Sequence, residues 1–209
     1  PLGNLIFGGH DGFVIFNADS NSVQRFVYDR ENTNGLSHPN VRAFYAPNDS
    51  ILWIGTANGL NRLNRNTGRF SHFFKEDGLP NNTINGIVHD EYGFLWISTN
   101  NGLVRFNPEQ RLFKSYSVAD GLQAKQFTLH SAFRSASGRV YFGGVNGFNA
   151  FQPKDVIPNQ TVPPVYITEF RLFNKPVTPQ TLDSPLNRDI LQTRHLELSH
   201  QYFFFSFQF

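Results

Sequence analysis

Apolar residues in this chain occur in short runs that are separated by clusters of glycine, asparagine and charged residues. Within residues 83–118 the runs TINGIVHD, FLWIST, LVRFN and LFKSYSV are divided at EYG, NNG and PEQ. Asn-Gly supplies the positive φ angles that a tight hairpin turn requires. A helix would need apolar residues at a spacing of three and four over about ten positions, and none of the runs is that long. The pattern therefore predicts four short antiparallel strands in this segment.

The same arrangement recurs along the chain. Residues 51–70, ILWIGTANGLNRLNRNTGRF, resemble residues 94–113, FLWISTNNGLVRFNPEQRLF, which follow at an interval of 43. Weaker copies of the central hairpin occupy residues 5–17 and 140–152. Four short strands in a unit of about 40 residues are typical of a propeller blade, because each blade must bury the same strand against its neighbours. The sequence thus contains four units, at about residues 1–34, 35–77, 78–120 and 121–153.

Composition agrees with β structure and excludes several classes of function. The chain has 23 Phe, 7 Tyr and 2 Trp, and aromatic side chains favour pleated, half-buried surfaces. A net charge of +2 without any run of Lys and Arg argues against nucleic acid as a partner. The absence of cysteine excludes disulfides, thiolate metal sites and cysteine nucleophiles. No apolar run approaches the roughly 18 residues that span a bilayer, and the absence of Met suggests a piece of a longer protein, so any membrane anchor is expected elsewhere.

Two segments resemble a known family. LWIGTANGLNRL and LWISTNNGLVRF, each followed by DGL, are similar to the two-component regulator propeller (Reg_prop) repeat of bacterial sensor receptors. GRVYFGGVNGFNAFQP, which runs into PPVYITEFRLFNKPV, resembles the last blade of such a propeller followed by the small β-sandwich called the Y_Y_Y domain. The resemblance implies propeller repeats over 1–153, a linker over 154–163 and the N-terminal part of an immunoglobulin-like sandwich over 164–209. We therefore expect an all-β protein: about four blades of an incomplete propeller, then a partial β-sandwich.

The chain departs from the family pattern in ways that predict exposed strand edges. Four units are fewer than these propellers usually carry, and the first unit has no innermost strand ahead of it. In the final QYFFFSFQF, alternation places one set of residues on an apolar face of a half-buried strand. These residues are Phe203, Phe205, Phe207 and Phe209, with Ser206 and Gln208 on the other face. Because unpaired edges template association, we expect pairing with another chain, as a homodimer or otherwise.

Most of the residues that could carry chemistry have a simpler structural role. The apolar residues of the second strands are interpreted as blade core, and the Asn-Gly pairs as turns. The acidic pairs Glu76–Asp77 and Asp90–Glu91 are expected to be solvated loop charges. Seven histidines are scattered, without the close spacing that a metal site needs. No nucleophile elbow or phosphate-binding loop is present, so we expect no catalytic residue, no metal and no cofactor.

The segments that enter the innermost strands are the candidate ligand site, because these strands line the channel of a propeller. Aligned on Gly35, Gly78 and Gly121, the segments SHPNVRAF, PNNTINGI and QAKQFTLH place polar pairs on one side and an apolar residue on the other. The candidate residues at this channel mouth are Asn40, Arg42, Thr83, Asn85, Gln126 and Thr128. Amides, hydroxyls and a guanidinium suit sugar hydroxyls or carboxylates; alternatively, they only hydrate a channel.

The resemblance implies the extracytoplasmic ligand-sensing region of a bacterial two-component sensor histidine kinase. Such a region lies in the periplasm, is anchored in the inner membrane through other parts of the parent, and binds an oligosaccharide or similar ligand. Binding would shift the equilibrium between two dimer arrangements, which the output domain reads. This segment would then not be an enzyme; the output domain would be a histidine kinase or, in some relatives, a diguanylate cyclase.

Two alternatives remain open. A propeller lyase or glycosidase would need two cooperating acid and base groups at the channel, where the sequence offers only His130 and no carboxylate. A protein-interaction scaffold of the WD40 kind would carry Gly-His and Trp-Asp signatures in each repeat, and these are missing.

Overall fold

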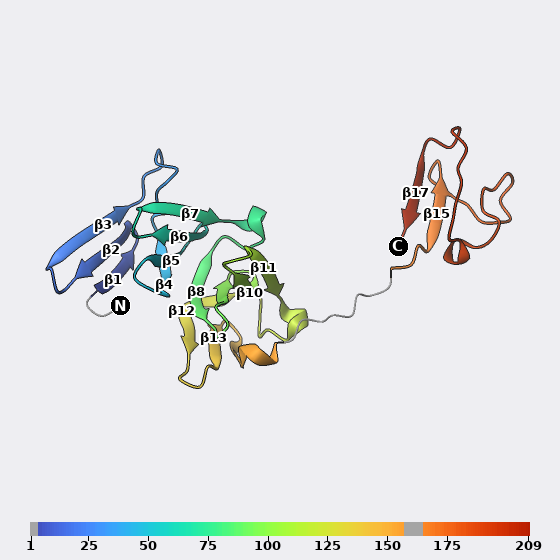
Figure 1. The fold of residues 1–209 in the computed structure, drawn as a ribbon. Coiled ribbons are helices and arrows are strands. Elements are labelled where there is room, and N and C mark those ends of the chain that lie inside the picture. The colour runs from blue at the N-terminus through green and yellow to red at the C-terminus, as the bar shows by residue number, and fades with distance from the viewer. Residues whose placement is uncertain (1–3, 157–164) are drawn as a thin grey trace. The chain divides into compact units, whose positions relative to one another are not determined.

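The structure is a computed structural model that describes residues 4–156 and 165–209. It contains strands and a few short 3-10 helices, which confirms the all-β prediction (Figure 1). The chain divides into two compact units, Pro1–Ile157 and Pro158–Phe209. One antiparallel sheet lies within each of the four sequence units, and a fifth lies in the C-terminal unit.

The second and third sheets each have four strands, as predicted. The second sheet has the order β4 (Val41–Tyr45), β5 (Ile51–Thr56), β6 (Leu60–Asn64) and β7 (Arg69–Phe73). The third sheet has the order β8 (Ile84–His89), β9 (Leu95–Thr99), β10 (Gly102–Asn107) and β11 (Leu112–Tyr116). The four strands of the third sheet coincide with the four runs TINGIVHD, FLWIST, LVRFN and LFKSYSV. Short 3-10 helices η1 (Lys75–Asp77) and η2 (Val118–Asp120) follow these sheets.

The first and fourth sheets have three strands each, for different reasons. β1 (Asn4–Gly9), β2 (Gly12–Asn17) and β3 (Ser22–Val27) correspond to the three outer strands of a blade, so the innermost strand is missing as expected. β12 (Phe127–Arg134), β13 (Val140–Gly144) and β14 (Gly147–Phe151) lack the outermost strand. In its place the chain forms η3 (Pro153–Asp155), which occupies the start of the predicted linker 154–163; residues 157–163 lie outside the described residues.

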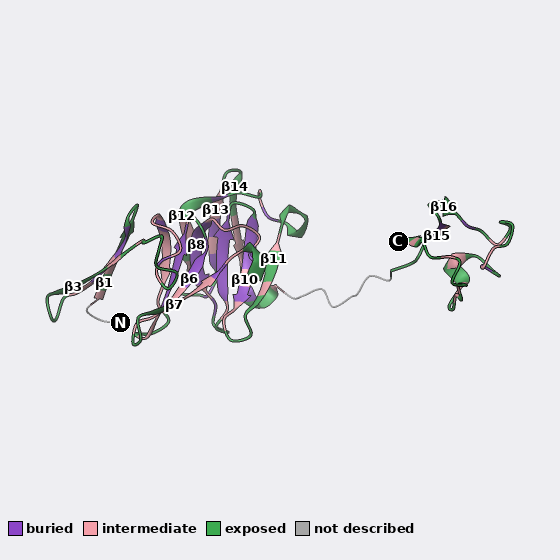
Figure 2. Cartoon of the chain, turned by 90° about the horizontal axis from the view of Figure 1, so that it is seen from above, coloured by how far each residue is buried: buried purple, intermediate pink, exposed green. Residues whose placement is uncertain are grey.

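Neighbouring sheets of the compact unit Pro1–Ile157 pack face against face. One cluster of buried residues joins the first and second sheets through Phe13 and Leu52, a second joins the second and third through Trp53 and Phe106, and a third joins the third and fourth sheets. Figure 2 shows this buried layer running through the sheets. The repeated strand is therefore repeated because each sheet buries it against a neighbour.

The innermost strands β4, β8 and β12 come close together at the centre of this unit (Figure 1). Glycine permits the approach: a Cβ added at Gly86 would lie 2.5 Å from the Cβ of Ala132. The close approach brings two residues of the predicted channel mouth, Arg42 and Asn85, into contact.

The C-terminal unit contains one described sheet, with the order β16 (Lys175–Pro176), β15 (Glu169–Leu172) and β17 (Phe205–Gln208), and the 3-10 helix η4 (Ile190–Gln192). Phe205 and Phe207 pair with Leu172 and Phe170, so they lie on the core side of the sheet. Their side chains nevertheless remain 49% and 40% exposed, and Phe203 and Phe209 lie outside the strand. The prediction of a half-buried strand over the whole of FFFSFQF was therefore wrong in extent, because little covers this face of an edge strand. The assignment to a Y_Y_Y sandwich stays a prediction.

Candidate functional site

The channel mouth contains the predicted alternation of polar and apolar residues. Val41, Ile84 and Phe127 are 6%, 0% and 4% exposed and belong to the packed core between sheets. The polar residues that flank them are therefore left on the other side of the innermost strands.

Arg42 and Asn85 are brought together by equivalent β-bulges. The pairing of β4 with β5 shifts register at Arg42, and the pairing of β8 with β9 shifts at Asn85. The pairing of β12 with β13 has a wider shift, across residues 128–131. A bulge leaves one residue unpaired and changes the direction of its side chain. The sequence alignment found these positions but gave no sign of the bulges.

The two side chains form a hydrogen-bonded chain across three sheets. Arg42 Nη1 donates to Asn85 Oδ1 at 2.9 Å, and Asn85 Nδ2 donates to the carbonyl oxygen of Phe127 and to Asn100 Oδ1, both at 2.9 Å. Asn85 is only 2% exposed, so its amide is fully engaged by the protein. The guanidinium of Arg42 keeps a buried Nε without a partner among the described residues. Arg42 is therefore the member of this hydrogen-bonded network that has a donor without a partner among the described residues.

The other four predicted residues are not gathered in the same way. Thr83 Oγ1 donates to the carbonyl oxygen of Ala57, in the turn between β5 and β6. The backbone carbonyl oxygen of Asn40 accepts a hydrogen bond from the backbone N–H of Ala57 at 3.0 Å. Gln126 and Thr128 are exposed. Thr83 and Asn40 thus hold the loops, and the candidate site at the channel mouth is centred on Arg42 and Asn85.

A cavity of about 500 Å³ opens beside this pair. Its other walls come from β1, β4, β8 and β12, and its remaining polar side chain is His130, which has a φ angle of 60°. No carboxylate from the described residues lines it. Nearby, burial and the charge of Arg42 lower the pKa of His38 below its ordinary value, so its ring is neutral at pH 7 and Nδ1 accepts from the N–H of Asn40.

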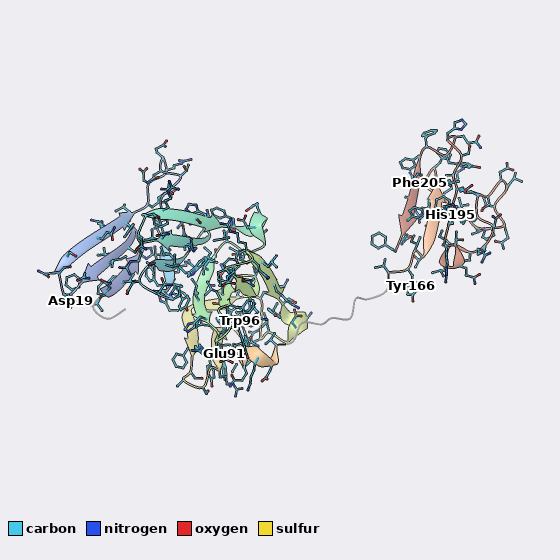
Figure 3. All side chains as sticks on the ribbon, viewed as in Figure 1. Asp19, Glu91, Trp96, Tyr166, His195 and Phe205 are labelled. Carbon is cyan, nitrogen blue, oxygen red and sulfur yellow. The ribbon has the colours of Figure 1, made fainter. Side chains whose placement is uncertain are left out.

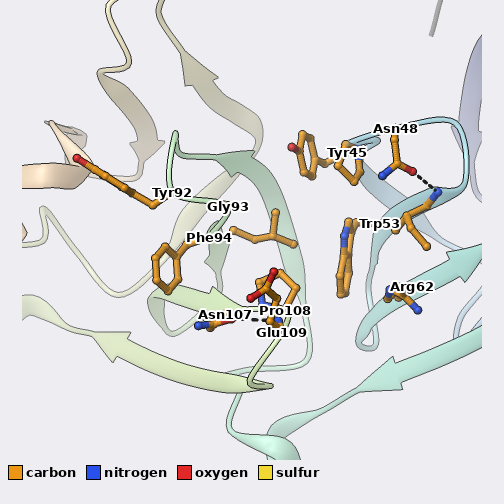
Figure 4. Close-up of a pocket in the computed structure, with 13 residues that line it drawn as sticks. Tyr45, Asn48, Trp53, Arg62, Tyr92, Gly93, Phe94, Asn107, Pro108 and Glu109 are labelled. Carbon is orange, nitrogen blue, oxygen red and sulfur yellow. Dashed lines mark hydrogen bonds between the residues drawn. The ribbon is translucent and has the colours of Figure 1, made fainter.

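A second cavity, of about 520 Å³, lies between the second and third sheets (Figure 4). Tyr45, Trp53 and Arg62 line it from the second sheet, and Tyr92 and Phe94 line it from the third. This cavity was not predicted from the sequence. Both tryptophans were assigned to the blade core, and a sequence does not show what each indole N–H contacts.

Asp90 corrects one prediction from the sequence. It is 3% exposed, not a solvated loop charge. Its carboxylate accepts from the backbone N–H groups of Tyr92 and Phe94 at 2.9 and 3.0 Å and from Trp96 Nε1 at 3.0 Å, and Arg105 Nε lies 3.9 Å away. Trp96, which is 1% exposed, and Glu91, which is exposed, both belong to the unit Pro1–Ile157 (Figure 3). Asp90 is buried because three hydrogen-bond donors and the nearby charge of Arg105 compensate for its lost hydration.

Two classes of feature are missing from residues 4–156 and 165–209. No group of three or more His, Asp or Glu side chains is placed to hold a metal ion. Within the same ranges, no helix has the length and apolar character needed to cross a membrane.

Comparisons with known proteins agree with this fold. Residues 78–101 match the family model described as two component regulator propeller. A curated relative, Histidine kinase P4 of Formosa agariphila, is 28% identical over an alignment that covers 95% of this chain and 18% of the relative.

Two solved structures were compared, and the first shows a similar fold. The extracellular domain of a putative hybrid two component system from B. thetaiotaomicron has a TM-score of 0.59 at 21% identity, over 73% of this chain and 20% of that domain. A second such domain from the same organism has a TM-score of 0.48 at 22% identity, over 83% of this chain and 30% of that chain. The chain thus spans about a fifth of the length of the first two relatives. The propeller resemblance seen in the sequence is confirmed: the third unit of this chain carries a two component regulator propeller repeat.

Proposed function

We propose that this chain is part of the extracytoplasmic ligand-sensing region of a bacterial two-component sensor histidine kinase. The ligand is an oligosaccharide or a similar polar molecule that binds at the channel mouth. The observation that carries the proposal is the hydrogen-bonded chain from Arg42 through Asn85 to the carbonyl oxygen of Phe127, which crosses three sheets beside an open cavity. The curated relative, which is a histidine kinase, supports the same assignment.

The chemistry of the cavity favours binding over hydrolysis. Acid and base catalysis of glycoside cleavage needs two titratable groups that cooperate across the bond. The cavity offers one histidine and, among the described residues, no carboxylate. Hydrogen bonds from Arg42 to hydroxyl or carboxylate oxygens would instead orient a sugar without reacting with it.

Signalling would follow from coupling between the sheets. A ligand that contacts Arg42 acts on three innermost strands at once, because Arg42 and Asn85 connect them. A ligand shifts an equilibrium only by its differential affinity for the two states, so the proposal requires two arrangements of the sensor dimer with unequal affinity. In this proposal the chain is periplasmic and associates through its exposed strand edges.

The test is a thermal-shift and calorimetric panel of neutral and acidic oligosaccharides against the complete extracytoplasmic region. A ligand that binds only the native state at 100 times its Kd raises stability by about 2.7 kcal/mol, which is a shift of several degrees. We expect Arg42→Gln to remove the shift for the binding glycan. The matched control is Arg69→Gln, an exposed arginine at the far edge of the second sheet, which should retain it.

A second readout is autophosphorylation of the full receptor in membrane vesicles with and without the same glycan. No thermal shift and no change in phosphorylation with any glycan would overturn the proposal. Release of shorter products would favour an enzyme, and a stoichiometric protein recovered from periplasmic extract would favour a scaffold.

A further inference from the structure

In the third sheet a tryptophan and an arginine lie beside a buried acid. Trp96 pairs across strands with Arg105, and both approach the buried carboxylate of Asp90. The indole N–H donates to Asp90 Oδ2 at 3.0 Å, and Arg105 Nε lies 3.9 Å from the same oxygen. In this register a tryptophan and an arginine thus flank one carboxylate, which is hydrogen-bonded to the indole and within ion-pair distance of the guanidinium.

The second sheet has the same donors without the acid. Trp53 pairs with Arg62, and these two residues lie 43 positions before Trp96 and Arg105. The residue 43 positions before Asp90 is Pro47, which has no acceptor in its side chain. Trp53 is only 3% exposed, and no hydrogen bond joins its Nε1 to an acceptor in residues 4–156 and 165–209, although this nitrogen keeps some contact with solvent.

Arg62 also lacks an acidic partner. No carboxylate of the described residues lies within 4.0 Å of its guanidinium. Trp53 and Arg62 both line the cavity of about 520 Å³ between the second and third sheets. These two donors have no acceptor among the described residues and line one cavity, so an anion in the cavity would accept from both. The cavity is where an acceptor would sit.

We propose that this cavity binds the carboxylate of an acidic sugar, with Trp53 and Arg62 contacting it as Trp96 and Arg105 contact Asp90. The walls suit a sugar ring, because Tyr45, Tyr92 and Phe94 provide aromatic surfaces for its apolar face. The cavity is separate from the channel mouth and shares none of its six candidate residues, so this inference does not depend on the proposed function.

One acidic side chain opposes the ligand. Glu109 lines the same cavity and is exposed, and its carboxylate lies beyond ion-pair distance of Arg62. Like charges in one site repel, so Glu109 lowers the affinity for an anion and restricts where its carboxylate can sit. Removing the charge of Glu109 should therefore strengthen anion binding, whereas removing the charge of Arg62 should weaken it.

The experiment uses the 209-residue chain labelled with ¹⁵N, since its two tryptophans give two indole N–H resonances. The resonances are assigned with Trp53→Phe. The probe is sodium glucuronate, with glucose as the neutral control. We expect glucuronate to move the Trp53 resonance in a saturable way and to leave that of Trp96 unchanged, because Asp90 already occupies the Trp96 N–H. Glucose should move neither.

Variants then locate the site. Arg62→Gln should weaken glucuronate binding at least about tenfold, because an ion pair with the carboxylate is lost, and Glu109→Gln should strengthen it. Arg69→Gln, an exposed arginine in the same sheet, should leave it unchanged. Thermal midpoints confirm that each variant is folded. The proposal is overturned if neither resonance moves, if glucose acts as glucuronate does, or if Arg62→Gln and Arg69→Gln behave alike.

Discussion

At the residue scale, the burial of Asp90 makes a specific claim about stability. Its carboxylate accepts three hydrogen bonds and is 3% exposed. Asp90→Asn keeps the shape but removes the charge and turns an NH₂ group toward a donor. Because a buried donor then loses its partner, we expect the free energy of unfolding to fall by about 1–3 kcal/mol. Urea unfolding followed by tryptophan fluorescence measures it, since both tryptophans lie in the first unit.

The neighbouring acid provides the control for Asp90. Glu91 lies 3.8 Å from Arg134, but 48% of its side chain is exposed. Solvent screens such a pair, so Glu91→Gln should change the free energy of unfolding by less than about 1 kcal/mol. Equal losses for the two variants would show that net charge matters at this turn and that the hydrogen bonds of Asp90 do not.

His89 makes stability depend on pH. Burial, followed by the charge of Arg134, lowers the pKa of His89 below its ordinary value of 6.5, and its ring stacks on Tyr45 at 4.6 Å. The unfolded chain therefore binds a proton at a higher pH than the folded chain does. Stability from the neutral ring is fully present above about pH 7.5 and is lost as pH falls through 6.5. Urea midpoints at pH 7.5, 6.5 and 5.5 should decline in that order.

Substitutions isolate the contribution of His89 to the pH dependence of stability. His89→Gln should flatten the decline between pH 7.5 and 5.5, and adding His38→Gln should flatten it further, since burial also lowers the pKa of His38. His10→Gln, at an exposed histidine, is the control. A decline of the same slope in every variant would assign the pH dependence to other groups.

At the element scale, the close approach of β8 and β12 depends on Gly86. A Cβ at this position would lie 2.5 Å from that of Ala132 and 3.1 Å from Ser98 Oγ. Gly86→Ala must push the two strands apart, and overpacking of this kind costs about 1–3 kcal/mol. Gly9→Ala is the matched control, because nothing lies within 4 Å of a Cβ there. Urea midpoints followed by tryptophan fluorescence should fall for the first variant only.

The elements also show how far the sequence could predict the structure. The four strands of the third sheet follow from alternation and Asn-Gly turns, which are local signals. The bulge that carries Asn85 is not local, because it depends on how β8 meets both β9 and β12. Asp90 looked like a turn charge because its burial depends on Trp96, six residues away. The pairing of Trp53 with Arg62 beside a proline could have been found from the sequence by asking which residue replaces Asp90 in the second repeat.

At the scale of the whole molecule, the first sheet, like the fourth at the other end of the series, packs only one of its faces against a neighbouring sheet. Phe13 and Ile15 pack against the second sheet. The opposite face carries apolar residues that are more than half exposed: Leu5, Phe7, Val23 and Val27, at 54%, 58%, 65% and 52%. Leu5 and Phe7 correspond to Leu52 and Ile54, which are completely buried against the preceding sheet. The first sheet thus presents a blade-packing face that no described residue covers.

This face should drive association of the 209-residue chain, because its side chains are of the kind that adjacent sheets bury and β1 also has an unpaired edge. We expect sedimentation velocity to show a mass that rises with protein concentration. The double variant Leu5→Lys and Phe7→Lys should stay monomeric with an unchanged thermal midpoint, because both side chains are already exposed. Leu112→Lys with Val118→Lys, at positions that are 61% and 50% exposed elsewhere in the first unit, is the matched control and should associate like the unaltered chain. If both double variants sediment alike, association does not use the first sheet, and the edge of β17 becomes the surface to test.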